Sequence, residues 1–123
     1  MRNIFQTVVF YFLLFSFLST SQAQDNKSID TDLAVKELLY TKYRNQVLAF
    51  NKSDFDNLFL EFFEKQNSSQ IQLSKEEFYT YTIKIAIYSE KLGLLYKDKK
   101  AEATQTKNEW FARSYSDYLN SKK

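Results

Sequence analysis

Hydrophobic side chains recur at intervals of three and four residues along most of the chain after residue 24, the spacing of one face of an α-helix. The first such stretch begins near Asp30 or Thr31, because either side chain can cap a helix. With one gap at Lys36, its apolar face consists of Leu33, Tyr40, Tyr43, Val47 and Phe50. The pattern therefore predicts a helix that ends at Asn51-Lys52.

A second helix is predicted to begin at Ser53. Its hydroxyl can cap the helix, and the carboxylates of Asp54 and Asp56 lie near the positive end of the helix dipole. The apolar face that follows is Phe55, Leu58, Phe59 and Phe62. The polar segment 66–70 has no periodicity, so the longest internal connection is expected between residues 66 and 73.

The strongest local signal is a capping box in which the Ser74 hydroxyl and the Glu77 carboxylate each accept from the other residue's backbone. Leu73 and Phe78 flank this box and are placed to form a hydrophobic staple. The helix that follows carries one apolar stripe through Ile85 and Leu92 and a second through Ile83 and Ile87. Two stripes predict that other helices cover it on more than one side, so we expect it to be central.

Gly93, the single glycine, leaves two interpretations open. A lone glycine after a periodic run is often the left-handed residue that ends a helix. Alternatively, the helix continues to Tyr96 and the chain turns at 97–100, which is slightly favoured because Leu92, Leu95 and Tyr96 keep the period. A last helix is then expected from Ala101 to Leu119.

Together these elements predict an all-α fold, a small bundle of three to four helices in one domain spanning residues 24–123. A chain of this length leaves no room for a second domain. The expected core positions are Leu33, Val47, Phe50, Phe55, Leu58, Phe59, Phe62, Phe78, Ile85, Leu92, Phe111 and Leu119.

Residues 1–23 have the layout of a secretory signal peptide. Arg2 supplies a cation, an apolar stretch extends from Val8 to Leu18, and Ser21 and Ala23 are small residues suited to cleavage after Ala23. The stretch is about half of the ~20 residues that a membrane-spanning helix needs. We therefore expect export to the periplasm or the extracellular space, with no stable membrane insertion after cleavage.

The composition removes several chemistries from these 123 residues. There is no His and no Cys, so Ser-His and Cys-His catalysis, zinc fingers and disulfides have no side chains to use. The chain has 17 Lys and Arg against 15 Asp and Glu. Such a balance argues against a nucleic-acid partner, which would require a concentrated basic face.

The carboxylates that occur in pairs, such as Glu61 with Glu64, are explained by helix dipoles and solvated faces better than by catalysis. No segment has the glycine and terminal glutamate of a calcium loop. We therefore expect no enzymatic activity, no metal site and no cofactor.

Aromatic side chains are the remaining candidates for a binding site. Tyrosine and tryptophan bury a large area at low entropic cost, which suits both a core boundary and a protein-binding surface. The place to expect an exposed patch is near the C-terminus, at Trp110, Phe111, Tyr115 and Tyr118.

Two functions of different classes stay open. The first is a non-catalytic protein-interaction module in the cell envelope or outside the cell, whose partner is another envelope or secreted protein. The alternative is a carrier of a small apolar ligand, with a cavity between its helices. The composition, free of Cys and rich in Lys, Asn, Phe and Tyr, suggests a bacterial chain.

Overall fold

The computed structural model describes the backbone of residues 26–123 and the side chains from residue 32 onward, so the expected signal peptide, residues 1–23, lies outside the described residues. Within this range the chain is all-helical, as predicted. Its elements are α2 (Asn26–Leu48), α3 (Lys52–Asn67), α4 (Lys75–Leu95), the 3-10 turn η2 (Lys97–Lys99), α5 (Lys100–Ala112) and α6 (Tyr115–Ser121).

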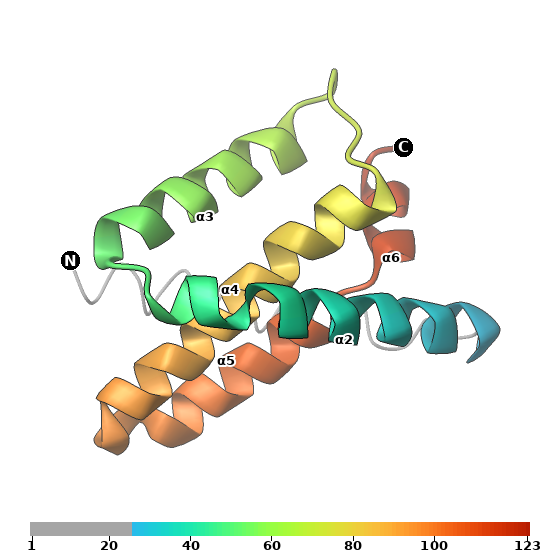
Figure 1. Ribbon diagram of the computed structural model, residues 1–123. Helices are drawn as coiled ribbons and strands as arrows, with labels where there is room; N and C mark the ends of the chain where they lie inside the picture. Colours follow the sequence, from blue (N-terminus) through green and yellow to red (C-terminus); the bar gives the residue numbers. More distant parts are fainter. Residues whose placement is uncertain (1–25) are drawn as a thin grey trace.

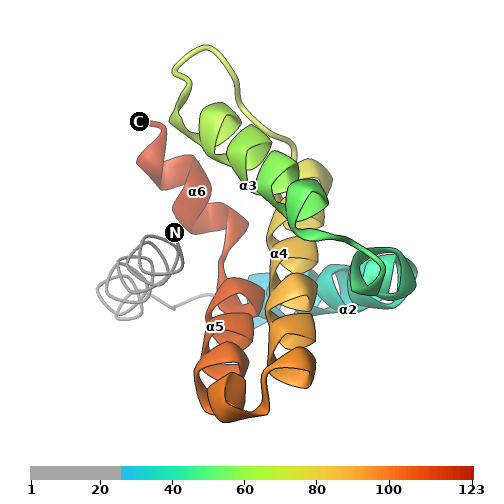
Figure 2. The ribbon, with the colours of Figure 1, turned by 90° about the vertical axis from the view of Figure 1, so that its left-hand side faces the viewer.

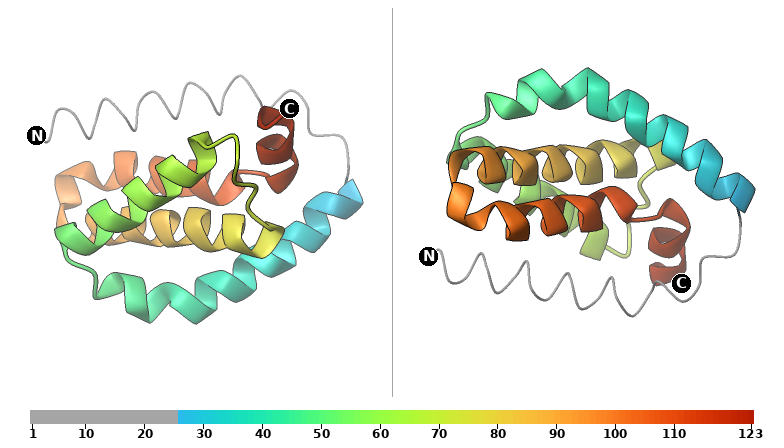
Figure 3. Two further views of the ribbon diagram at one scale, coloured as in Figure 1. Left: turned by 90° about the horizontal axis from the view of Figure 1, so that it is seen from above. Right: turned by 90° about the horizontal axis from the view of Figure 1, so that it is seen from below.

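Helix α4 is the centre of the fold, as its two apolar stripes predict. It packs against α2, α3, α5 and α6. In the view of Figure 1, α4 separates α3 from α5, which runs antiparallel to α4 as the second arm of a hairpin. Helix α2 lies against α4, and its first turns extend beyond the N-terminal end of α4 (Figure 3).

The described residues form five α-helices rather than the predicted three to four, because the expected last helix is interrupted. Arg113 and Ser114 have extended backbone conformations, and the Ser114 side chain accepts a hydrogen bond from the backbone N–H of Asp117 at 3.1 Å. This serine caps a new helix. Residues 101–119 therefore form two helices, α5 and α6, that point in different directions (Figure 2).

The capping box at the start of α4 is confirmed. The Ser74 side chain accepts from the Glu77 backbone at 3.1 Å, and the Ser74 backbone donates to the Glu77 carboxylate at 2.8 Å. Leu73 and Phe78 on either side are both buried in the core. The capping box and the two buried residues that flank it thus both mark Lys75 as the start of α4.

The predicted cap of the second helix is wrong. Asn51, not Ser53, is the N-cap of α3, and it forms a capping box with Asp54. The Asn51 side chain accepts from the Asp54 backbone at 2.8 Å, and the Asp54 carboxylate accepts from the Asn51 backbone at 3.0 Å. Helix α3 therefore begins two residues nearer to α2, and α2 ends at Leu48, earlier than expected.

Gly93 does not end α4. The helix continues to Leu95 without a positive φ at Gly93, and the turn follows as η2, which confirms the favoured interpretation. A Cβ at this position would lie 3.1 Å from the Cβ of Ala103 in α5. The glycine therefore permits the close approach of the two arms of the hairpin.

The core agrees in part with the expected positions. Five of them are buried: Val47, Phe55, Phe62, Phe78 and Ile85. Six others pack against this core while they remain partly exposed: Phe50, Leu58, Phe59, Leu92, Phe111 and Leu119. The core also contains buried side chains that the predicted set omits: Leu39, Leu73, Tyr79, Ile83, Ala86, Ile87, Tyr88, Trp110 and Tyr118.

Leu33 was wrongly placed in the core, since its exposed fraction is 41%. The inward face of α2 instead contains Asp32 and Lys36, which are buried, and continues through Leu39 and Val47. Leu33 lies about 100° around the helix from its neighbour Asp32. The gap at Lys36 in the apolar pattern is therefore a core position occupied by a charged residue.

Candidate functional site

The predicted aromatic residues do not form an exposed patch. Trp110 and Tyr118 have exposed fractions of 3% and 4%, and Phe111 and Tyr115 are partly buried. The Trp110 ring packs edge-on against Phe62 in α3, with ring centroids 5.9 Å apart. The Tyr118 ring stacks on Phe78 of α4 at 4.9 Å. The exposed patch expected here is thus replaced by internal packing.

Tyr115 and Tyr118 instead form hydrogen bonds with the backbone of the loop before α4. The Tyr118 hydroxyl accepts from the Leu73 backbone N–H at 2.8 Å, and the Tyr115 hydroxyl donates to the Leu73 carbonyl at 2.7 Å. These two residues form what we call the tyrosine clamp. Because the clamp satisfies both backbone groups of a buried residue, its role is structural.

A second polar contact joins α2, α4 and α6 inside the fold. The Tyr79 hydroxyl donates to Asp32 at 2.6 Å and accepts from the Tyr115 backbone N–H at 2.9 Å. Lys75 lies 2.8 Å from the other oxygen of Asp32. Burial opposes ionisation of Asp32, but the hydrogen bonds from Lys75 and Tyr79 outweigh it, so the pKa of Asp32 lies below its ordinary value.

The same contact keeps Tyr79 protonated. Burial raises the pKa of Tyr79, and the hydrogen bond to Asp32 raises it further. Lys36 lies above the Tyr79 ring, 5.1 Å from its centroid, and burial lowers the pKa of this lysine while the charge of Asp32 opposes that change. Asp32, Lys36 and Tyr79 therefore connect α2 to α4 inside the fold and do not form an open binding site.

Glu90 is the centre of a cluster between the α4–α5 hairpin and α2. The Tyr40 hydroxyl donates to it, Arg44 lies 3.1 Å from one of its oxygens and Lys107 lies 3.4 Å from the other. We call these four residues the Glu90 cluster. Burial opposes ionisation of Glu90, but the hydrogen bonds from Tyr40 and Arg44 and the charge of Lys107 prevail, so the pKa of Glu90 is lowered.

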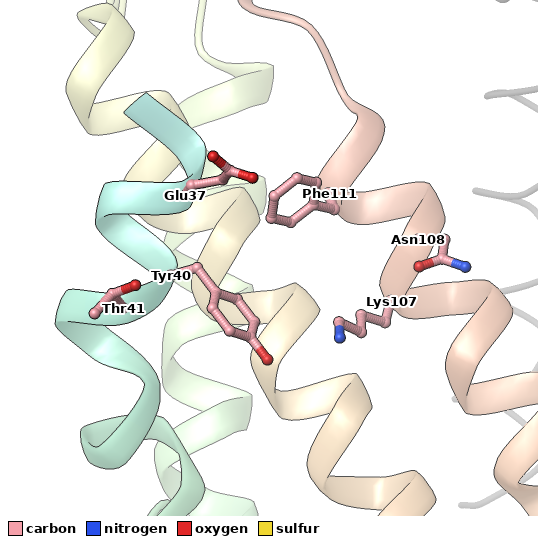
Figure 4. A pocket seen from close by; sticks show the side chains of 6 residues that line it. All are labelled: Glu37, Tyr40, Thr41, Lys107, Asn108 and Phe111. Atoms are coloured by element: carbon pink, nitrogen blue, oxygen red, sulfur yellow. The ribbon is translucent and has the colours of Figure 1, made fainter. Parts of the chain in front are cut away.

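An open pocket of about 600 Å³ lies between α2 and α5 and shares Tyr40 and Lys107 with this cluster. Its lining is Glu37, Tyr40, Thr41, Lys107, Asn108 and Phe111, three residues from each helix (Figure 4). The Tyr40 and Phe111 rings meet edge to face, with centroids 6.3 Å apart. This α2–α5 pocket combines two aromatic rings with a carboxylate, an ammonium, an amide and a hydroxyl.

Large apolar side chains are exposed at the far end of the α4–α5 hairpin. Leu94, Leu95 and Tyr96 have exposed fractions of 57%, 60% and 56%. They are consecutive, and we call them the hairpin tip. The exposed residues Lys97, Lys99 and Lys100 follow directly. In Figure 1 and Figure 2 this end of the hairpin projects beyond the other described helices.

The sequence contains only a partial signal for the hairpin tip. Helical spacing puts Leu94 off the face that Leu92, Leu95 and Tyr96 share, so this spacing directs Leu94 toward solvent. The exposure of Leu95 and Tyr96 depends on how far the hairpin extends past the other described helices. The pocket was also not predicted, because Glu37 and Lys107 lie on helices whose relative placement only the fold establishes.

Within the described residues no group of three acidic, His or Cys side chains is arranged to hold a metal ion. Among the same residues, none of the helices has the length and apolar character required to cross a membrane.

Comparison of the chain with models of known protein families, with curated proteins and with solved structures finds no match.

Proposed function

We propose that the protein is an exported, non-catalytic interaction module that binds another envelope or secreted protein through its hairpin tip. The observation that carries the proposal is the exposure of three consecutive large apolar side chains, Leu94, Leu95 and Tyr96. Clustered exposed apolar residues with a polar surround mark interaction surfaces more often than isolated ones do. Covering such side chains yields roughly 25 cal/mol per Å² of apolar area removed from water.

The surroundings of the tip define the chemistry of the partner. Lys97, Lys99 and Lys100 follow the apolar residues, and the nearby carboxylates are Asp98 and Glu102, of which Glu102 lies 3.8 Å from Lys99. An apolar tip that carries one surplus positive charge fits an apolar groove that has an acidic rim. Charge complementarity of this kind raises association rates and selects partners.

The other parts of the proposal rest on the sequence. The layout of residues 1–23 supports export and cleavage after Ala23, and with them a location in the periplasm or outside the cell. The alternative function, a carrier of a small apolar ligand, gains no support from the α2–α5 pocket, because Glu37 and Lys107 are part of its lining.

The test is native mass spectrometry of protein isolated gently from cells and medium, compared with a tip variant, Leu94→Ser with Leu95→Ser. We expect the parent to retain a second polypeptide that the tip variant loses. The control is Leu38→Ser, which removes a leucine from α2 that is more exposed than those of the tip, with an exposed fraction of 71%. A parent without a partner, or a partner lost only from the control, would overturn the proposal.

A further inference from the structure

The α2–α5 pocket has opposite charges on its two walls. Glu37 from α2 lies beside the Phe111 ring, and Lys107 from α5 faces the Tyr40 ring, 5.3 Å from its centroid (Figure 4). The two aromatic rings lie between these charges. A molecule seated over the rings would therefore meet an anion at one end and a cation at the other.

Several polar groups of the pocket have hydrogen-bonding capacity to spare. The side chains of Glu37, Thr41 and Asn108 line the pocket but make no hydrogen bond or ion pair with any residue from 32 to 123. A carboxylate accepts only, a hydroxyl donates and accepts, and an amide does both. The pocket can thus receive both a donor group and an acceptor group.

The Glu90 cluster leaves a surplus positive charge next to the pocket, with which it shares Lys107. Arg44 and Lys107 share the single carboxylate of Glu90, at 3.1 Å and 3.4 Å. Lys107 has three N–H donors, and its side chain keeps an exposed fraction of 29%. At least one of its donors is therefore open to an anionic group of a ligand.

We propose that the α2–α5 pocket binds a small zwitterion, a free amino acid or a short peptide. Its ammonium group would pair with the Glu37 carboxylate beside the Phe111 ring. Its carboxylate would accept from Lys107 and Asn108. The volume of about 600 Å³ is within the range of small-molecule sites. The site does not involve the hairpin tip, so it stands apart from the proposed protein partner.

The test is an amide NMR titration of the purified protein with L-phenylalanine. Two singly charged probes separate the ends of the pocket: N-acetyl-phenylalanine carries only the anion, and phenylalanine amide carries only the cation. We expect saturable shifts confined to residues 37–41 and 107–111, with millimolar affinity, because the pocket is open. Each singly charged probe should bind about threefold to fivefold more weakly, the effect of one exposed ion pair.

Glu37→Gln provides the decisive comparison. It should weaken binding of phenylalanine by about the same factor and leave N-acetyl-phenylalanine unchanged, since that probe has no ammonium group. The matched control is Glu64→Gln on α3, which is exposed and lies outside the pocket lining. Three probes of equal affinity, shifts elsewhere, or no saturation at about 20 mM phenylalanine would each overturn the proposal.

Discussion

The Tyr79 hydroxyl donates to the Asp32 carboxylate at 2.6 Å, and both side chains are buried between α2 and α4. The same hydroxyl accepts from the backbone N–H of Tyr115 at the start of α6. One phenol therefore connects three helices that are far apart in the sequence. A buried carboxylate is tolerated here because its oxygens are bound by Tyr79 and Lys75.

Tyr79→Phe should lower the free energy of unfolding by about 1–3 kcal/mol, because it leaves Asp32 and the Tyr115 N–H without their shared partner. Urea denaturation followed by circular dichroism measures the change. Tyr81→Phe is the control, since its hydroxyl bonds Glu61 and Lys65 at a part-exposed position. That variant should lose less than about 1 kcal/mol. Equal losses in the two variants would show that the buried contact stabilises the fold no more than the part-exposed one does.

Stability should fall in acid because the pKa values of Asp32 and Glu90 are lowered in the folded state. Their contribution is fully present above the ordinary values of 3.8 and 4.5 and is lost as the pH drops through the lower folded values. The unfolded chain binds these protons first, so acid favours unfolding. Urea midpoints between pH 6 and about pH 3 measure the effect.

Asp32→Asn isolates one of these two groups. The variant should be less stable than the parent near neutral pH, and its stability should depend less steeply on pH below about 4. Glu64→Gln, which removes an exposed carboxylate from α3, is the comparison. An unchanged slope in Asp32→Asn would contradict the assigned role of Asp32.

Gly93→Ala tests the close approach of α4 and α5. Alanine in a helix interior is worth about 1 kcal/mol over glycine, but the new methyl group would lie 3.1 Å from the Ala103 side chain. We expect no net stabilisation in the parent. In an Ala103→Gly background, where that contact is absent, the same change should stabilise by about 1 kcal/mol. The same effect in both backgrounds would mean that the contact carries no energy.

The tyrosine clamp makes a local prediction. Tyr118→Phe leaves the buried N–H of Leu73 without its acceptor, so amide hydrogen exchange in the loop 68–74 should accelerate more than in α5. Tyr43→Phe on α2 is the control, because its hydroxyl makes no hydrogen bond within residues 32–123. Exchange that rises uniformly across the chain would indicate global destabilisation rather than release of the loop.

Local signals predicted the parts of the fold that local chemistry determines. The box of Ser74 and Glu77 and the continuation of α4 past Gly93 were both predicted from a few neighbouring residues. The break at Ser114 was not predicted, because the apolar period continues through it. The local signal was the cap that Ser114 forms with Asp117, and the contacts of Tyr115 and Tyr118 with Leu73 and of Tyr115 with Tyr79 fix the new direction of the chain.

The candidate site was harder to predict for the same reason. Lys36 is a gap in the apolar pattern, yet it is buried, because the Tyr79 and Phe111 rings and the charge of Asp32 surround it. An aromatic stripe likewise does not reveal which rings are exposed. Trp110 and Tyr118 became core residues, whereas the exposed apolar surface formed at the end of the hairpin.

The most direct test of the proposed interaction is photo-crosslinking in living cells, with a benzophenone amino acid placed at Tyr96 of the hairpin tip. We expect one discrete protein adduct from Tyr96 and none from the same probe at Leu38, which is exposed on α2. No adduct from Tyr96, or the same adduct from both positions, would contradict the assignment of the hairpin tip as the binding surface.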